Sequence, residues 1–208
     1  LHDGTIRYEI GDPKLKAEKS LQFDAALGIN THHLTVELDV FSNTINDFIF
    51  SQKLSNTSGG DSVTQGYSTF RFVSGNAQLM GGEIMIDIHP HPLDWLHVEN
   101  AFSYVQAAQK NQPDSTKYLP FTPAPKIQSE LKADIKSKAK WLSNAYVKVE
   151  LENYLEQNHF YSAYGTETKT PAYTLLNIGA GTDLKRKDHT VCSFYISINN
   201  LTDVAFQN

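Results

Sequence analysis

The most regular feature of the chain is a period-two alternation of hydrophobic and polar side chains. In one run, Leu34, Val36 and Leu38 alternate with Thr35 and Glu37. Successive side chains of a β-strand point to opposite faces, so each run predicts a strand with one apolar and one polar face. About eight such runs occur, at residues 21–29, 34–40, 84–88, 96–104, 127–135, 145–151, 176–184 and 192–198. They predict an all-β fold whose strands form an antiparallel up-and-down meander.

Several of these predicted strands are long. The patterned segments Leu34–Phe50 and Leu142–Phe160 far exceed the roughly 5–6 residues that are typical of strands in soluble domains. At about 3.3 Å per residue, a strand of roughly 17 residues spans about 55 Å, which is more than the ~30 Å hydrocarbon core of a bilayer. The alternation changes phase near Phe41, which predicts a β-bulge there.

The connecting segments alternate between short and long. Short links fall at residues 31–33, 90–94, 137–140 and 187–188. Long links, rich in Ser, Thr, Gly, Asn and Gln, fall at Ser51–Gln65, Gln109–Pro123 and Tyr161–Pro171. Tight periplasmic turns that alternate with extended extracellular loops are typical of outer-membrane β-barrels.

Composition and charge argue against several other classes of protein. The chain has 208 residues, a net charge of −5 and one cysteine, Cys192. No apolar run is long enough for a transmembrane helix, the scattered charge argues against nucleic-acid binding, and one cysteine cannot form an internal disulfide. The first residues lack the basic and apolar regions of a signal peptide. No catalytic motif is present, so we predict neither enzymatic activity nor a cofactor.

Six stretches, in this order and over nearly the whole chain, resemble the C-terminal part of a TonB-dependent outer-membrane receptor barrel. Among them, Leu119–Pro125 is similar to the family's L-P-x-x-P loop and Thr170–Asn177 to its T-P-x-Y-T-L-x-N strand. The others are Gly11–Ser20, Phe41–Ile49, Ala77–Glu83 and Asn199–Asp203.

This resemblance implies that residues 1–208 form one partial domain of a 22-stranded transmembrane barrel, without the plug, the first strands or the final strand. The whole receptor would sit in the outer membrane of a Gram-negative cell, in contact with lipid. It would bind a scarce nutrient outside and admit it with energy passed on by TonB, which contacts the absent N-terminal region. A ferric siderophore or haem is the expected ligand, with cobalamin, a metal or an oligosaccharide as further possibilities. The open sheet edges would pair with missing strands or with copies of the fragment.

Aromatic and basic residues near the long loops are the candidates for ligand binding. They are Tyr67, Arg71, Lys117, Tyr118, His159, Tyr161 and Tyr164. The competing interpretation is that the aromatic residues around Tyr154 and Phe160 belong to an interfacial girdle. Trp95 and Trp141, beside short links, are interpreted as girdle residues on the periplasmic side.

We predict no metal site. His89 and His91, in the sequence His-Pro-His-Pro, are two residues apart and flanked by prolines, which favours a rigid turn over a pair of ligands. His32 and His33 are predicted at the surface of another turn, and His97 on the polar face of its strand.

Two other classes of protein remain open on the sequence. One is a passive porin or adhesin-like barrel without a plug. The other is a soluble all-β carbohydrate-binding or hydrolytic sandwich, in which the apolar faces of two sheets would pack about 10 Å apart.

Overall fold

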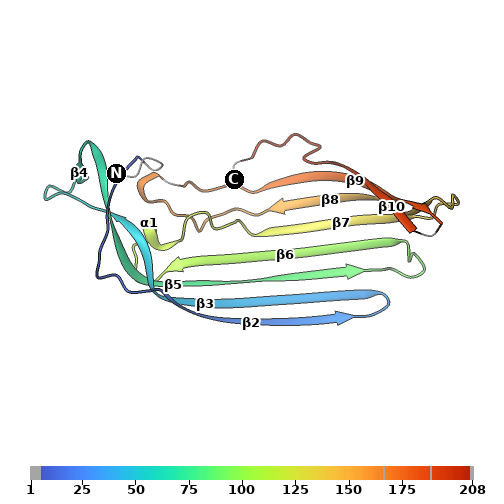
Figure 1. Ribbon diagram of the computed structural model, residues 1–208, viewed down its shortest axis with the longest axis horizontal. Coiled ribbons are helices and arrows are strands. Elements are labelled where there is room, and N and C mark those ends of the chain that lie inside the picture. The colour runs from blue at the N-terminus through green and yellow to red at the C-terminus, as the bar shows by residue number, and fades with distance from the viewer. Residues whose placement is uncertain (1–5, 166, 188, 207–208) are drawn as a thin grey trace.

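The computed structural model describes residues 6–165, 167–187 and 189–206. Its strands form a single ten-stranded sheet (Figure 1). The strands are β1 Tyr8–Ile10, β2 Lys19–Asn30, β3 Leu34–Lys53, β4 Val63–Thr64, β5 Tyr67–Ile88, β6 Leu96–Gln109, β7 Lys126–Ile135, β8 Leu142–Tyr154, β9 Tyr173–Arg186 and β10 His189–Ile198. Two short helices, α1 Asp114–Lys117 and η1 Ala163–Gly165, lie in the connecting loops.

The long strands pair with their neighbours in chain order, as the alternation predicts. The sheet runs β10-β9-β8-β7-β6-β5-β3-β2, and these pairs are all antiparallel. Two short strands add to this meander at β5 and were not predicted: β4 forms a hairpin with it, and β1 pairs with it in parallel. The predicted antiparallel meander of about eight strands is therefore confirmed.

Two details of the prediction are wrong. The bulge in β3 lies between Ile45 and Phe48, where Asp47 has a φ of 57°, and not at Phe41. Phe41 instead pairs in register with Gly81, where an added Cβ would meet its ring. The strand predicted over Leu142–Phe160 ends at Tyr154, because the chain there leaves the sheet to form a loop.

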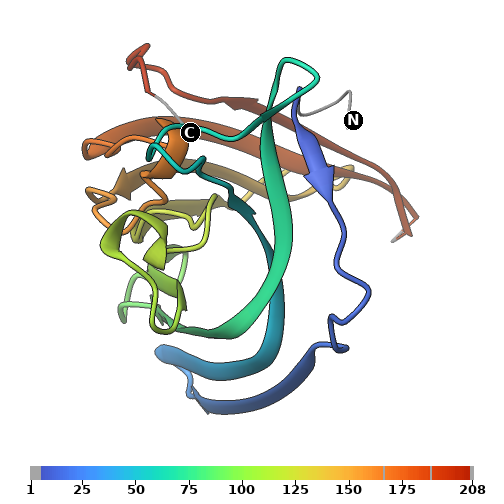
Figure 2. The ribbon, with the colours of Figure 1, turned by 90° about the vertical axis from the view of Figure 1, so that its left-hand side faces the viewer.

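The exposure of the two faces is the reverse of that in a soluble domain. On the face called here the apolar face, Leu131 and Val149 expose 49% and 45% of their surface. On the opposite, polar face, the side chains of Glu130 and Glu150 expose only 17% and 13%. The described strands form one layer that curves into an open trough (Figure 2). No second sheet covers the apolar face within this part of the chain, so the two-layer sandwich that the sequence left open as an alternative is wrong.

The polar face carries a row of acidic side chains that crosses the strands. The pairing register places Asp87, Glu99, Glu130 and Glu150 side by side on β5 to β8. Lys148 on β8 reaches the acidic row, with its Nζ 2.7 Å from Glu130 Oε2 and 3.5 Å from Glu150 Oε2. Like charges directly opposite each other in a sheet destabilise it unless cations lie nearby. The lysine therefore stabilises the row at its β7–β8 end.

The two ends of the sheet differ. At the turn end, short links join β2 to β3, β5 to β6 and β7 to β8 (Figure 1). Trp95 and Trp141 lie beside these links, where the sequence placed them. At the loop end lie the long links 54–66, 110–125 and 155–172, together with both short helices. None of the described helices is long and apolar enough to cross a membrane.

Candidate ligand site at the loop end

The hairpin of β4 and β5 extends the wall beyond the other strands. Its turn has Gln65 and Gly66 at φ values of 53° and 86°, as a two-residue type I′ turn requires. The link before it is closed by Asn56, whose Oδ1 accepts hydrogen bonds from the backbone N–H groups of Ser58 and Gly60. Seen from the loop end, β5 sweeps across the open side of the trough (Figure 2). The hairpin therefore brings the outer parts of β3 and β5 towards the other loops.

Side-chain hydrogen bonds to the backbone join the second and third loops. Gln157 is buried, and its amide donates hydrogen bonds of 3.0 and 2.8 Å to the carbonyl oxygens of Thr122 and Pro123. Glu167 accepts a hydrogen bond from the N–H of Phe121 at 2.5 Å and another from the N–H of Tyr161 at 2.8 Å. Such bonds to a carboxylate are stronger than neutral ones. They fix the loop segment that carries Tyr161 and Tyr164.

Tyr164 is the residue that joins the third loop to the hairpin. Its backbone has a φ of 60°, a conformation that is uncommon for residues other than glycine. Its ring meets Phe70 edge to face, with the centroids 5.5 Å apart. Its hydroxyl accepts a hydrogen bond of 3.2 Å from the N–H of Lys53, whose Nζ lies 5.5 Å from the ring centroid. Residues 111 positions apart therefore meet at one point.

A hollow of about 680 Å³ lies at this meeting point, and we call it the mouth hollow. Its wall is formed by β3, β5 and the loops, and it includes Phe48, Phe50, Phe70, Phe121, Tyr161 and Tyr164. Arg7 and Lys53 add two cations. The Arg7 guanidinium lies 4.7 Å from the Phe70 ring centroid. Volume and aromatic lining are both in the range of small-molecule binding sites.

Both cations of the mouth hollow have a carboxylate partner. Arg7 Nε lies 2.7 Å from Glu9 Oε1, and Lys53 Nζ lies 2.5 Å from Asp61 Oδ2. Burial, together with the neighbouring Tyr164, raises the pKa of Tyr161 to about 12. The Tyr161 phenol is therefore neutral at physiological pH. It can donate a hydrogen bond and present an aromatic face, but it carries no negative charge.

The predicted candidates separate into three groups. Tyr161 and Tyr164 line the mouth hollow. Tyr118 stacks on His159 with the ring centroids 4.6 Å apart, and Lys117 Nζ lies 5.4 Å from the Tyr118 ring centroid.

The other two candidates lie on the hairpin strand. Tyr67 pairs with Thr64 in the hairpin. Arg71 is exposed, and strand alternation points it away from the side of β5 on which its neighbour Phe70 lies. A role in ligand binding stays a prediction for all seven.

Sequence reasoning missed Arg7, Lys53, Phe48, Phe50 and Phe70. The spacing of Phe48 and Phe50 could have indicated two rings on one face of an outer strand. Arg7 had no usable signal, because it reaches the hollow only through the parallel pairing of Tyr8–Ile10 with Thr69–Arg71.

A one-layer antiparallel sheet with an exposed apolar face, a charged concave face and alternating short and long links is the wall of a transmembrane β-barrel. Comparison with known families agrees: residues 2–201 match the TonB dependent receptor-like, beta-barrel family. The chain belongs to this family.

Two solved structures show the same fold. The chain is similar to the copper transporter OprC, with a TM-score of 0.69, 15% identity, and coverage of 94% of this chain and 28% of that one. It is also similar to BauA, the ferric preacinetobactin receptor from Acinetobacter baumannii, with a TM-score of 0.59, 20% identity, and coverage of 91% of this chain and 26% of that one. The chain thus spans about a quarter of the length of either structure.

Proposed function

We propose that the chain forms part of the wall and the ligand-facing loops of a TonB-dependent active transporter in the outer membrane of a Gram-negative bacterium. The transported ligand is an iron chelate, a ferric siderophore in preference to haem. The observation that carries this proposal is the mouth hollow, which is aromatic, carries Arg7 and Lys53, and is built from loops at one end of the wall. Family membership and the likeness to two transporter structures support it.

The lining of the mouth hollow favours a bulky ligand with flat groups. Tyr161 and Tyr164 both line the hollow with aromatic rings, whose centroids lie 6.2 Å apart and whose planes are inclined by 59°. Arg7 and Lys53 each already have a carboxylate partner. Their residual positive field attracts an anionic chelate without requiring a high ligand charge. Because the Tyr161 phenol is neutral, it contacts the ligand as a ring and as a hydrogen-bond donor.

In this proposal, other parts of the whole receptor supply the remaining strands, the plug and the contact with TonB. Strands beyond β2 and β10 complete a barrel of 22 strands, so that the two edges pair within one receptor and not between copies. A plug closes the lumen, and TonB contacts the receptor outside residues 1–208. The segment itself binds and guides, and it performs no chemistry and needs no cofactor.

Uptake of radioactive iron tests the transport step. Cells that express the intact receptor as their sole iron-chelate receptor are given a panel of ferric siderophores and haemin. We expect accumulation of one ferric siderophore, and we expect it to stop when TonB is deleted or the proton-motive force is dissipated. Uptake that continues without TonB would support the passive porin instead. Uptake of haemin alone would show that the ligand is haem and not a ferric siderophore, while the proposed active transport would stand.

A matched pair of variants tests the site. Tyr164→Ala removes a ring of the mouth hollow, whereas Lys169→Ala removes an exposed cation of the same loop that does not line the hollow. We expect Tyr164→Ala to weaken binding of the transported siderophore by about tenfold, since an aromatic contact contributes ~0.5–1.5 kcal/mol beyond its buried area. Lys169→Ala should leave the affinity within about twofold. If the two variants change the siderophore affinity equally, the ligand does not bind in the mouth hollow.

A further inference from the structure

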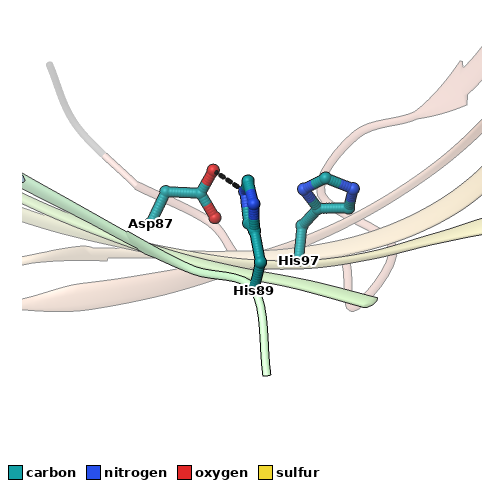
Figure 3. A group of neighbouring side chains, drawn as sticks. All are labelled: Asp87, His89 and His97. Carbon is teal, nitrogen blue, oxygen red and sulfur yellow. Dashed lines mark hydrogen bonds and ion pairs between the residues drawn. The ribbon is translucent and has the colours of Figure 1, made fainter. Parts of the chain in front are cut away.

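A second group of chemistry-bearing side chains lies at the turn end, on the polar face. Asp87 and His89, two residues apart at the end of β5, point to the same side, and the pairing of Ile88 with Val98 places His97 opposite His89. All three side chains rise from one side of the sheet (Figure 3). One ligand atom from each lies within 4.8 Å of the others. The sequence did not predict this cluster, because it arises from the pairing of β5 with β6 and not from the spacing of the residues along the chain.

Within the described part of the chain, the contacts of these side chains leave one buried carboxylate oxygen without a hydrogen-bond partner. Asp87 Oδ2 lies 2.7 Å from His89 Nε2. Asp87 Oδ1 is buried and has no hydrogen-bond partner among the described residues. Asp87 also lies directly opposite Glu99, at the end of the acidic row that is far from Lys148. A buried, unpartnered carboxylate oxygen beside a second carboxylate is costly unless a cation joins it.

The surroundings orient the two imidazoles. The His89 and His97 rings meet at an angle of 72°, with their centroids 4.5 Å apart. Asp134 Oδ2 on β7 lies 3.2 Å from His97 Nε2, as outer carboxylates do when they hold a metal-binding histidine in place. Lys132, the neighbouring lysine, lies 3.7 Å from the other oxygen of Asp134. His91, by contrast, turns away to Asp94 and His33.

We propose that Asp87, His89 and His97 form a binding site for a divalent first-row transition metal ion, with Zn²⁺ as its simplest occupant. Two imidazoles and one carboxylate suit Zn²⁺, Cu²⁺ or Ni²⁺, whereas Mg²⁺ and Ca²⁺ prefer oxygen ligands alone. Three protein ligands leave a coordination position open to water or to another group. The site lies at the opposite end of the sheet from the mouth hollow and does not depend on the ligand proposed there.

Zinc binding to the intact receptor tests this site. The receptor, purified in detergent and stripped with a chelator, is titrated with ZnCl₂ by calorimetry, and bound zinc is counted after dialysis. We expect the double variant His89→Ala/His97→Ala to bind one ion fewer than the wild type. His89→Ala and His97→Ala should each lower the affinity for that zinc ion by at least about tenfold. Asp134→Asn should lower it by about tenfold. The control His91→Ala, in the same turn, should keep the ion.

Zinc binding that is equal in the wild type and the double variant would overturn the site, as would a loss with His91→Ala as large as with His97→Ala. Circular dichroism melting checks that each variant is folded. A measurement without any substitution guards against misfolding. Hydrogen exchange of the wild type should slow at residues 87–97 when ZnCl₂ is added, and unchanged exchange there would also refute the proposal.

Discussion

The loop end and the turn end of the sheet are built from the same strands, yet they hold their side chains together in different ways. At the turn end, contacts join residues that are close in sequence or directly paired, such as Thr31 with Leu34 and His89 with His97. At the loop end, contacts join segments far apart, such as Lys53 with Tyr164 and Phe121 with Glu167. Local contacts form with the hairpin itself, whereas distant ones form only when several loops are in place. We therefore expect the loop end to respond more strongly to single changes.

The largest effect should come from removing the third loop. Replacing residues 161–170 by a short Gly-Ser link deletes Tyr161 and Tyr164 and both bonds of Glu167, but leaves β8 and β9 intact. The two lost ring contacts amount to ~1–3 kcal/mol, so affinity for the transported siderophore should fall by up to about a hundredfold. Equilibrium binding to the purified receptor measures this. An affinity within about threefold of the wild type would mean that the loop does not take part in binding.

A smaller effect should follow from removing the hydrogen bonds that Glu167 makes between the second and third loops. Glu167→Ala removes the acceptor of the Phe121 and Tyr161 N–H bonds, which should cost the ordered loop about 1–2 kcal/mol. Limited proteolysis should then cleave the second and third loops faster, and siderophore affinity should fall by up to about tenfold.

The matched control is Glu156→Ala in the same loop. Its partner Lys169, 2.7 Å away, is also solvent-exposed, and exposed ion pairs contribute little to stability. If the protease cleaves the two variants at the same rate, the hydrogen bonds of Glu167 are not what orders the loops.

A substitution at the turn end should change the stability of the protein without changing its affinity for the siderophore. The Thr31 hydroxyl donates to the Leu34 carbonyl at 3.0 Å and accepts from the Leu34 N–H at 3.1 Å. Thr31→Ala should lower the free energy of unfolding by about 1 kcal/mol, whereas Thr31→Ser, which keeps the hydroxyl, should stay close to the wild type. Denaturant titration in detergent measures both. A change in siderophore affinity with Thr31→Ala would show that the two ends are coupled.

The smallest effect is spectroscopic. With its pKa raised to about 12, Tyr161 should keep its proton as pH rises through the range in which ordinary tyrosines lose theirs. The absorbance difference between the wild type and Tyr161→Phe should therefore show no phenolate until the pH approaches 12. A difference signal that appears near pH 10 would mean that the phenol is open to water.

The wall of the protein could be predicted from the sequence much more fully than the site. The alternation around Leu131 and Val149 correctly assigned the exposed apolar face, because a period of two depends only on the local backbone. The bulge was misplaced, since a single extra residue leaves a small trace in a long pattern. Of the seven candidate residues, Tyr161 and Tyr164 reached the mouth hollow. Arg71 does not line the hollow, because the direction of its side chain is set by the orientation of β5.

The sequence by itself therefore determined the strands, their two faces and the division into short turns and long loops, all of which follow from local periodicity and turn chemistry. Only the tertiary structure decided which loop residues meet and which strand neighbours share a site. The Lys53–Tyr164 contact depends on the curvature of the sheet and on loops held by side-chain bonds to the backbone. The Asp87, His89 and His97 cluster depends on the register of β5 against β6. Neither curvature nor register leaves a periodic signal in the chain, because both arise from contacts between segments and not within them.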